Sequence, residues 1–420
     1  MTTVRSKEPA VQQRPPLFER PGVRPAGLRD VLRDIGGTYI VNGFVGLVFS
    51  ASGPIAVTLA VGAAGGLSQA ELASWVFGIF LSAGLATLVM SLIYRQPLGF
   101  AWSIPGTVLL GPSLQHLSFA EVVGAFFTCG VFTLALGLSG VVRRVMAAVP
   151  LPIVMAMVAA VFLRFGTDLV DSAQVDPLVV VPMVAVFILL SALPQLGRML
   201  PPVLGTLIVG IIAVGFTGQF NFNADGPIFA VPMLIMPEFT WAAQLELLIP
   251  LMLTVLVVQN GQGVAVLRAA QHQPPVNVFA VASGFFSIVN AFFGAVSACV
   301  TGPTNVLLTS SGQRHRHYTA ALVYAVLSLG CALIAPTLVQ FLLGTPEAFI
   351  LALAGIAMLP ALQQAFVTAF SGRFTLGALV TFVVTVSGFD LFNIHAAFWG
   401  IVLGYGISRL IERRDHHEPT

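Results

Sequence analysis

The sequence predicts an all-α polytopic membrane protein whose fourteen transmembrane segments form two inverted repeats of seven segments. Three observations carry this prediction: the composition, the apolar runs and the placement of arginine. Hydrophobic residues make up 57% of the 420 positions and charged residues only 9%, whereas a soluble domain carries about 25% charged residues. The chain has too few polar side chains to cover a globule in water, so the composition indicates an integral membrane protein.

The two ends of the chain differ from the rest because they are polar. Residues 1–35 contain five prolines and seven Lys/Arg, and they lack an apolar secretory segment with a cleavage site. We therefore predict that residues 1–35 form a disordered cytoplasmic tail. Residues 412–420 are predicted to form a short cytoplasmic tail at the other end.

Apolar runs separated by charges and by Gly/Pro clusters define the segments. Two of them, the third and the tenth, are shorter than the roughly 20 residues that a full membrane-spanning helix needs. Both also contain Gly and Pro. The predicted segments are 36–64, 70–94, 98–112, 118–140, 145–166, 174–195, 201–218, 243–267, 275–294, 297–312, 318–344, 346–364, 373–389 and 393–411.

Positive charge indicates whether the two short segments cross the membrane. With the N-terminus in the cytoplasm, the cytoplasmic junctions hold arginines such as Arg95, Arg268 and Arg373. Of the 19 Lys/Arg, only Arg164 falls on the far side. Omitting either short segment would invert every junction between the two. The charge pattern therefore favours fourteen crossings, with both termini in the cytoplasm.

The two short segments also resemble each other. Residues 103–110 read SIPGTVLL and residues 301–308 read TGPTNVLL, so that Pro105 aligns with Pro303. The match falls on the third segment of each half. Because each half has an odd number of segments, the second half is inverted relative to the first. Interrupted helices at matching positions of inverted repeats are the best sequence indication of a transporter's binding site.

Each aligned proline marks the start of a half-helix. Proline is tolerated in the first helical turn, and the residue before it favours an extended backbone. We therefore predict extended chain over 99–104 and 297–302, followed by short helices whose N-termini face each other near the middle of the membrane. Unpaired N–H groups and the positive ends of the two helix dipoles would make an anion site there. The alternative is a pair of helices broken only for packing.

Amide side chains interrupt the eighth segment, which contains VVQNGQG over 257–263. Unpaired amides are costly in lipid, so Gln259, Asn260 and Gln262 are expected to face protein or water. They are predicted to bind substrate, with hydrogen bonding between helices as the alternative. Ser50 in the first segment is a further candidate for lining the site.

The sequence offers no catalytic or metal-binding set at membrane depth. Asp390 is interpreted as a residue of an outer turn, His116 as an outer-loop residue and His395 as a packed or interfacial histidine. The three cysteines show neither metal-site nor disulfide spacing. We therefore predict a protein that is not an enzyme and that uses no cofactor and no metal.

Three motifs resemble one family of carriers. They are AWSIPGTVLLG (101–111), VVQNGQGVAVLRA (257–269) with PPVN (274–277), and TGPTNVLLTSSG (301–312). All three are similar to the benzoate:proton symporter family, BenE, and the resemblance extends over about residues 27–411. It implies uptake of benzoate or a related aromatic carboxylate, coupled to protons, across the bacterial inner membrane.

The resemblance also implies the architecture of nucleobase–ascorbate and sulfate-type carriers. In those carriers a core domain lies against a gate domain, and substrate binds between the third and tenth segments with the first and eighth alongside. By this resemblance, residues 36–140 and 243–344 form the core domain, and residues 145–218 and 346–411 form the gate domain.

That placement agrees with the site predicted from the broken helices. Nucleobase carriers have an acidic residue in the eighth segment, where this chain has Gln259 and Asn260, so the proton-carrying group is not identified. Trp102 is a candidate for packing on the substrate ring. The predicted substrate-binding residues are Ser50, Trp102, Ser103, Pro105, Gly106, Thr107, Gln259, Asn260, Gln262, Gly302, Pro303, Thr304 and Asn305.

The predicted partners are a small aromatic carboxylate, protons and the lipid bilayer, with no role for nucleic acid. The sequence permits a homodimer but does not require one. Two rival functions stay open. One is a carrier of another anion or of a nucleobase on the same fold, and the other is a passive anion channel.

Overall fold

The protein is built almost entirely of helices. The computed structural model describes residues 18–142, 144, 149–221, 226–389, 391 and 396–417. Each of the fourteen predicted segments contains a helix in this structure, and the sheet found among the described residues has two short strands. The helical membrane fold predicted from the composition is confirmed.

The first half of the chain follows the predicted segments. Helices α2 and α3 together make up the first segment, and strand β1 with helix α5 makes up the third. The elements are α1 (Leu28–Asp34), α2 (Gly37–Ser50), α3 (Gly53–Ala64), α4 (Gln69–Tyr94), β1 (Phe100–Trp102), α5 (Ile104–Ser113), α6 (Phe119–Ser139), α8 (Leu151–Val175), α9 (Pro177–Ala192), α10 (Pro194–Met199) and α11 (Pro202–Thr217).

The second half repeats the order, with strand β2 and helix α15 as the tenth segment. The eighth segment is one continuous helical stretch that contains a π-helical turn, η1. The elements are α12 (Trp241–Leu253), η1 (Thr254–Gln259), α13 (Asn260–Ala269), α14 (Val276–Phe292), β2 (Ala298–Val300), α15 (Gly302–Leu308), η2 (Arg314–Arg316), α16 (His317–Leu333), α17 (Ala335–Leu343), α18 (Glu347–Phe370), α19 (Thr375–Val386), α20 (Ala396–Ile411) and α21 (Arg413–His417).

Local sequence signals set several helix starts. Capping boxes begin α4 and α6, where Ser68 and Ser118 accept hydrogen bonds from the backbone N–H groups of Glu71 and Glu121. In return, each glutamate accepts a hydrogen bond from the backbone N–H of its serine. Two otherwise unpaired donors are satisfied at each helix start, which fixes where the helix begins.

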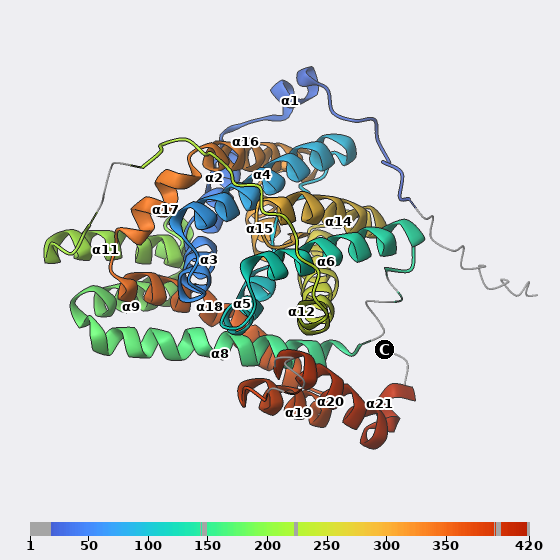
Figure 1. The fold of residues 1–420 in the computed structure, drawn as a ribbon. Coiled ribbons are helices and arrows are strands. Elements are labelled where there is room, and N and C mark those ends of the chain that lie inside the picture. Colours follow the sequence, from blue (N-terminus) through green and yellow to red (C-terminus); the bar gives the residue numbers. More distant parts are fainter. Residues whose placement is uncertain are drawn as a thin grey trace, which may run out of the picture.

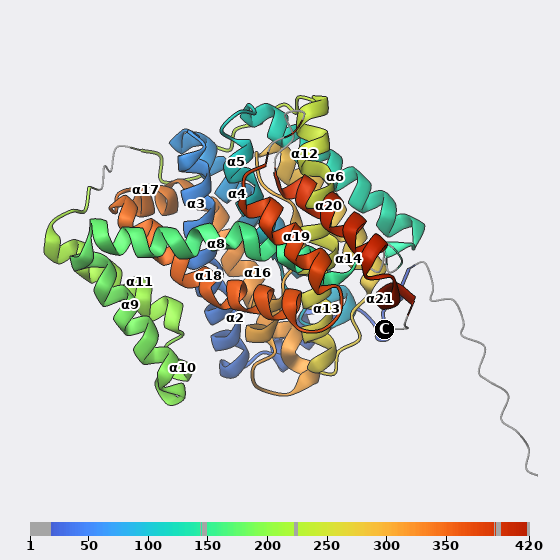
Figure 2. The ribbon, with the colours of Figure 1, turned by 90° about the horizontal axis from the view of Figure 1, so that it is seen from below.

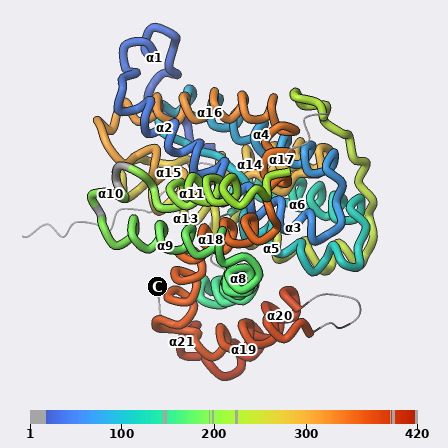
Figure 3. Tube along the Cα trace, turned by 90° about the vertical axis from the view of Figure 1, so that its left-hand side faces the viewer, coloured from blue at the N-terminus to red at the C-terminus, as the bar shows by residue number. Residues whose placement is uncertain are grey.

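The helices fall into two packed groups. In the first group α4 packs on α16 and α6 packs on α14, and α2, α3, α5, α12, α13 and α15 complete the group. In the second, α8 packs along α18, and α9, α11, α19 and α20 lie around this pair. Figure 2 shows α8 crossing the molecule, with α9–α11 near one end and α19 and α20 near the other. Helix α1 and helices α19–α21 lie at opposite extremes (Figures 1 and 3).

The number of crossings is not fixed by helix length alone. Among the described residues, six helical stretches are long and apolar enough to span a bilayer, or seven if α16 and α17, bent by 72°, count as one span. Five further apolar helices have 10–17 residues. The broken third and tenth segments are confirmed, and the total of fourteen crossings stays a prediction.

Part of the predicted N-terminal tail is folded, so the prediction of disorder was wrong there. Residues 28–34 form α1, in which Asp30 and Asp34 are buried. Arg95 lies 3.2 Å from the Asp34 carboxylate, and the Tyr318 hydroxyl donates to it at 2.8 Å. A hydrogen bond from Arg33 lowers the pKa of Asp34. These charge-assisted contacts order a segment whose composition alone suggested a free tail.

The fifth segment begins and ends later than predicted. It was expected over 145–166, but α8 runs over Leu151–Val175, so Asp168 and Asp171 lie on the helix and not in an outer loop. Gly166 and the charges of Asp168 and Asp171 suggest an end to the segment, but the helix continues through all three residues to Val175. Residues 1–17, Arg143, Asp225, Asp390 and His395 lie outside the described residues.

Candidate functional site

Two crossovers meet in the middle of the molecule. Strand β1 pairs antiparallel with β2, in the register Phe100 with Val300, Ala101 with Cys299 and Trp102 with Ala298. The Ser103 N–H donates to the Ser297 carbonyl at 3.0 Å. The extended chain predicted before each of the two prolines is thus present, and antiparallel pairing places the starts of α5 and α15 at opposite ends of the two-stranded sheet.

Side chains from neighbouring helices satisfy the outer edges of this small sheet. Thr87 of α4 accepts a hydrogen bond from the Phe100 N–H at 2.8 Å, and Ser287 of α14 accepts one from the Ala298 N–H at 3.0 Å. The Asn260 Oδ1 accepts from the Val300 N–H at 2.8 Å. Buried backbone groups need such partners because no water reaches them. The sheet is therefore a fixed element of the site.

The start of α5 is closed by its own cap. The Ser103 hydroxyl accepts a hydrogen bond from the Gly106 N–H at 3.0 Å and donates to the Thr254 hydroxyl at 3.1 Å. Thr107 donates to the Ser103 carbonyl at 3.0 Å, and Pro105 has no N–H to offer. The polar groups at this end of α5 thus already have protein partners.

The start of α15 is different. Thr301 occupies the cap position, yet its side chain makes no capping bond. Its hydroxyl is buried and has no hydrogen-bond partner among the described residues, although Thr301 is 5% exposed overall. An unsatisfied buried hydroxyl costs about 1–3 kcal/mol. An unpaired polar group beside the N-terminus of α15 is the arrangement expected where a ligand supplies the missing partner.

Glutamine side chains of the eighth segment lie beside this open end. A Cβ placed on Gly302 would come within 3.1 Å of the Gln262 Cβ and 3.3 Å of its Oε1. Gln259 is 5% exposed and ends the π-helical turn η1. Neither glutamine has a side-chain hydrogen bond to any described residue. Single π-turns occur frequently at functional sites, and this one carries both Thr254 and Gln259.

Close approach of the eighth segment to β2 requires glycine at position 263. A Cβ there would lie 2.6 Å from the Val300 Cγ1 and 2.8 Å from the Val300 carbonyl oxygen. The contact brings α13 against the second crossover, which is how Gln262 comes to lie next to Gly302.

Two of the predicted substrate-binding residues, Asn305 and Asn260, are already hydrogen bonded to protein groups. The Asn305 amide donates to the Gly99 and Thr301 carbonyls at 2.9 and 2.7 Å, and its Oδ1 accepts from the Gly99 N–H at 3.0 Å. Asn260 also contacts Ser283 at 3.3 Å. Both amides are therefore occupied by protein groups that tie the crossovers together, which is the interhelical role kept open for Asn260 by the sequence.

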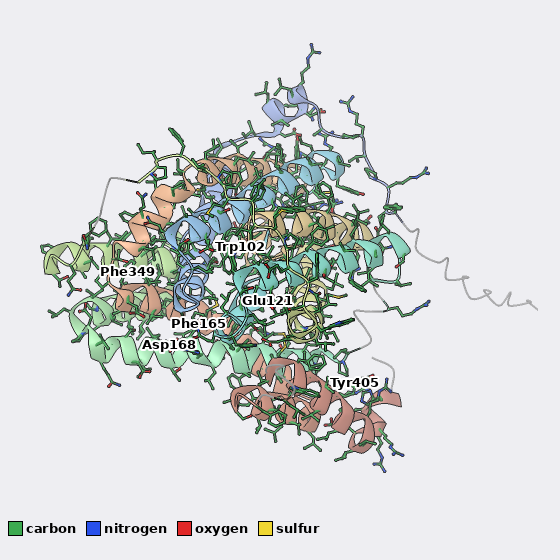
Figure 4. The ribbon with its side chains drawn as sticks, viewed as in Figure 1. Trp102, Glu121, Phe165, Asp168, Phe349 and Tyr405 are labelled. Atoms are coloured by element: carbon green, nitrogen blue, oxygen red, sulfur yellow. The ribbon has the colours of Figure 1, made fainter. Side chains whose placement is uncertain are left out.

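Ser50 is linked to β1 through Tyr324, and Trp102 is the last residue of β1. The Ser50 hydroxyl donates to the Gly46 carbonyl at 3.1 Å and lies 3.5 Å from the Tyr324 hydroxyl, which donates to the Phe100 carbonyl. Trp102 is buried, with its ring centroid 5.3 Å from that of Phe80. Figure 4 places Trp102 in the interior of the bundle. Its indole N–H has no hydrogen-bond partner among the described residues.

A large cavity lies beside the site, between the two helix groups. It has a volume of about 1200 Å³ and is lined by α3, α5, α8, α18 and α19. None of the predicted site residues lines it, but Val108 and Leu109, which follow Thr107 directly, do. Arg164 and Asp168 of α8 also line the cavity, and Figure 4 shows Phe165 and Asp168 along this helix. Sequence reasoning missed these wall residues because the cavity depends on how the two groups pack.

Comparison with known proteins agrees with this geometry. A family model described as benzoate membrane transport protein, BenE, matches residues 34–410. The chain belongs to this family. Two curated relatives match this chain over 90% of its length. Inner membrane protein YdcO of Escherichia coli is 28% identical over 90% of this chain and 97% of its own. A benzoate membrane transport protein of Acinetobacter baylyi is 26% identical over 90% of this chain and 96% of its own.

Solved structures show the same fold. The transmembrane domain of the cyanobacterial bicarbonate transporter BicA has a TM-score of 0.58 at 16% identity, covering 92% of this chain and 98% of that domain. The murine Solute Carrier 26 family member A9 anion transporter has a TM-score of 0.60 at 12% identity, covering 91% of this chain and 70% of its own. This member of the benzoate transport family is thus a membrane transporter and not an enzyme.

Proposed function

We propose that the protein takes up benzoate or a related aromatic carboxylate together with protons across the bacterial inner membrane, with both termini in the cytoplasm. Membership of the benzoate transport family supports the substrate class. The observation that carries the proposal is the open start of α15, where the unpartnered Thr301 hydroxyl adjoins the N-terminus of a broken helix. Such an end attracts an anion through unpaired N–H groups and the helix dipole.

The proposed site lies between the two crossovers. The carboxylate binds at Thr301, Gly302 and Thr304, and Gln259 and Gln262 supply further hydrogen bonds. Pro303 sets the start of α15, and Asn305 and Asn260 hold the crossovers in place. On the opposite side the site is closed by α5, through Ser103, Pro105, Gly106 and Thr107, with Trp102 at the end of β1 and Ser50 linked to that strand.

The cavity between the helix groups is the proposed route for the substrate ring. It is lined mainly by aliphatic side chains, including Leu59, Val108 and Ile350. An aromatic ring gains free energy from leaving water for such a surface. The cavity separates the two helix groups, which we propose to be the core domain (α2–α6 and α12–α17) and the gate domain (α8–α11 and α18–α20). Motion of one group against the other would give alternating access.

Uptake of labelled benzoate into proteoliposomes tests the function. With an inward proton gradient, we expect concentrative uptake that a protonophore abolishes. Competition should be strong with unlabelled benzoate and weak with benzamide, the neutral amide of the same shape. Uptake that never exceeds equilibrium would indicate a passive channel or facilitator. Transport of bicarbonate or uracil in place of benzoate would establish the rival carrier of another anion or a nucleobase.

A further inference from the structure

A buried carboxylate lies at the far end of α5 from the proposed substrate site. Glu246 of α12 is 3% exposed, and one of its oxygens accepts a short hydrogen bond from the Ser113 hydroxyl at the end of α5. Its other oxygen lies 3.0 Å from the His116 Nε2. The His116 side chain is 32% exposed and lines the large cavity. One end of this cluster is thus buried and the other reaches the cavity.

The ion-pair partner of Glu246 is a titratable side chain, His116. Within the described part of the chain, no arginine or lysine forms an ion pair with Glu246. The carboxylate of Glu121 interacts electrostatically with His116. Figure 4 shows Glu121 at the start of α6. Helix α20 also packs on α12, but its Tyr405 and Arg409 are hydrogen bonded to each other, and Tyr405 lies against His416 near the C-terminus. The cavity wall adds Arg164, Asp168 and Glu347.

This arrangement suits reversible binding of one proton. An ionised Glu246 accepts hydrogen bonds from Ser113 and from a protonated His116 nitrogen, whereas a protonated Glu246 can donate in its turn. Histidine is the side chain whose charge changes most readily between about pH 5 and 8. A proton from the cavity therefore reaches His116 first and is shared with the buried carboxylate, where an unpaired charge would be costly.

The cluster is mechanically connected to the substrate site through two helices. Ser113 ends α5, and α5 begins ten residues earlier at the Ser103 cap, a span of about 15 Å along a helix axis. Glu246 lies on α12, which runs directly into the π-helical turn that carries Thr254 and Gln259. The stretch formed by α5 and its Ser103 cap therefore contacts the continuous stretch α12–η1 at two points. One is the Ser113–Glu246 hydrogen bond at the cluster, and the other is the Ser103–Thr254 hydrogen bond of 3.1 Å at the substrate site.

We propose that Glu246, together with His116, is the proton-binding site of the transport cycle, loaded from the cavity and coupled to substrate through α5 and α12. This inference rests on the proposed function of proton-coupled benzoate uptake. It places the proton-carrying group near the start of the eighth segment, on α12, and not at the positions of Gln259 and Asn260. The two proposals make separate predictions, because a proton site can be detected without substrate.

Transport by Glu246→Gln tests the coupling. Glutamine keeps the shape and a hydrogen-bond acceptor for Ser113 but cannot bind a transported proton. We expect at least about a tenfold loss of proton-driven benzoate accumulation, while exchange of internal unlabelled for external labelled benzoate stays within about threefold of wild type. The matched control is Glu121→Gln, which changes a neighbouring capping carboxylate and should keep proton-driven accumulation within about threefold. Loss of exchange and accumulation together in correctly folded Glu246→Gln would assign the residue a structural role and overturn the proposal.

Infrared spectroscopy of the purified protein tests the proton site without substrate. Wild type should show a carboxylic C=O band that appears on acidification, and Glu246→Gln should lack it. His116→Gln should shift the midpoint of this titration. If the wild-type band is absent, or is unchanged in Glu246→Gln, the proton-site proposal fails whatever the substrate. If the band behaves as expected but wild type takes up no benzoate, the proposed substrate fails and the proton site stands.

Discussion

The two crossovers share one design but differ at the point where ligand would bind. At β1–α5 the Ser103 side chain caps the helix and is itself held by Thr254. At β2–α15 the Thr301 side chain makes no cap, and its hydroxyl has no hydrogen-bond partner in the part of the chain that the structure describes. The side chain that braces the second crossover is Asn305, which bonds to Gly99 at the entry to the first.

The difference indicates that an inverted repeat need not give a symmetrical site. Both half-helices begin after an extended strand and a proline, yet one start is satisfied internally and the other is left open. We infer that α5 is the rigid, closed wall of the site and that α15 is its anion-binding side. The following predictions test this difference between the two helix starts, in decreasing order of expected effect.

Asn305→Ala should have the largest effect. It removes the side-chain partner of the buried Gly99 carbonyl, whereas the Gly99 N–H keeps its hydrogen bond to the Pro97 carbonyl. We therefore expect the free energy of unfolding to fall by about 1–3 kcal/mol and transport to be lost. Thermal unfolding in detergent and benzoate uptake measure the two effects. The matched control is Thr309→Ala on the same helix, which removes only hydrogen bonds to Asn305 and Val306 carbonyls within that turn. An Asn305→Ala protein with wild-type stability would contradict the bracing role.

Gly302→Ala should weaken substrate binding without unfolding the protein. The added methyl group would press on Gln262 at 3.1–3.3 Å and displace it from the open end of α15. We expect the KM for benzoate to rise by about three- to tenfold, with a smaller change in kcat. Gly330→Ala on α16, where a Cβ would meet nothing within 4 Å, is the control. Equal KM values for the two variants would place the substrate elsewhere.

Acid should loosen the contact between the loop after α13 and the start of α16. His272, in the loop after α13, lies 3.2 Å from His317, and burial, with the neighbouring charges, lowers its pKa to about 4. Since the unfolded chain binds this proton near pH 6.5, the stabilisation is present above about pH 6.5 and is lost as pH falls toward about 4. We expect a decrease in Tm of about 2–5 °C over this range, and a flatter profile in His272→Gln. An identical profile in the variant would remove His272 as the cause.

Ser103→Ala should have the smallest effect on transport. Loss of the cap costs about 1 kcal/mol of stability, but the Gly106 N–H then becomes a second free donor near the substrate. We expect a lower Tm and a KM for benzoate within about threefold of wild type. Ser113→Ala at the other end of α5 makes a useful comparison, since it should disturb proton coupling more than substrate affinity.

Much of the architecture follows from the sequence. Pro105 and Pro303 predict both breaks, because each fixes the start of a helix and the extended chain before it. The aligned Val-Leu-Leu runs identify the repeat. The starts of α4 and α6 also follow from Ser-x-x-Glu patterns that are readable in the chain.

The details of the site depend on contacts that sequence does not contain. Whether Asn305 binds substrate or Gly99 is decided by how the two crossovers pair, 206 positions apart in the chain. His116 is interpreted from the sequence as an outer-loop residue because nothing in the sequence shows that it contacts the buried Glu246 of α12. The π-helical turn at Gln259 and the cavity between the helix groups likewise arise from packing.

The most direct test of the asymmetric site is the equilibrium affinity of purified protein for benzoate in Thr301→Val and Ser103→Ala. Valine keeps the shape of threonine and removes the unpartnered hydroxyl. The account predicts that Thr301→Val weakens binding by at least about tenfold without loss of Tm, and that Ser103→Ala changes it by less than about threefold. Equal effects, or a stronger effect in Ser103→Ala, would contradict the assignment of α15 as the anion-binding side.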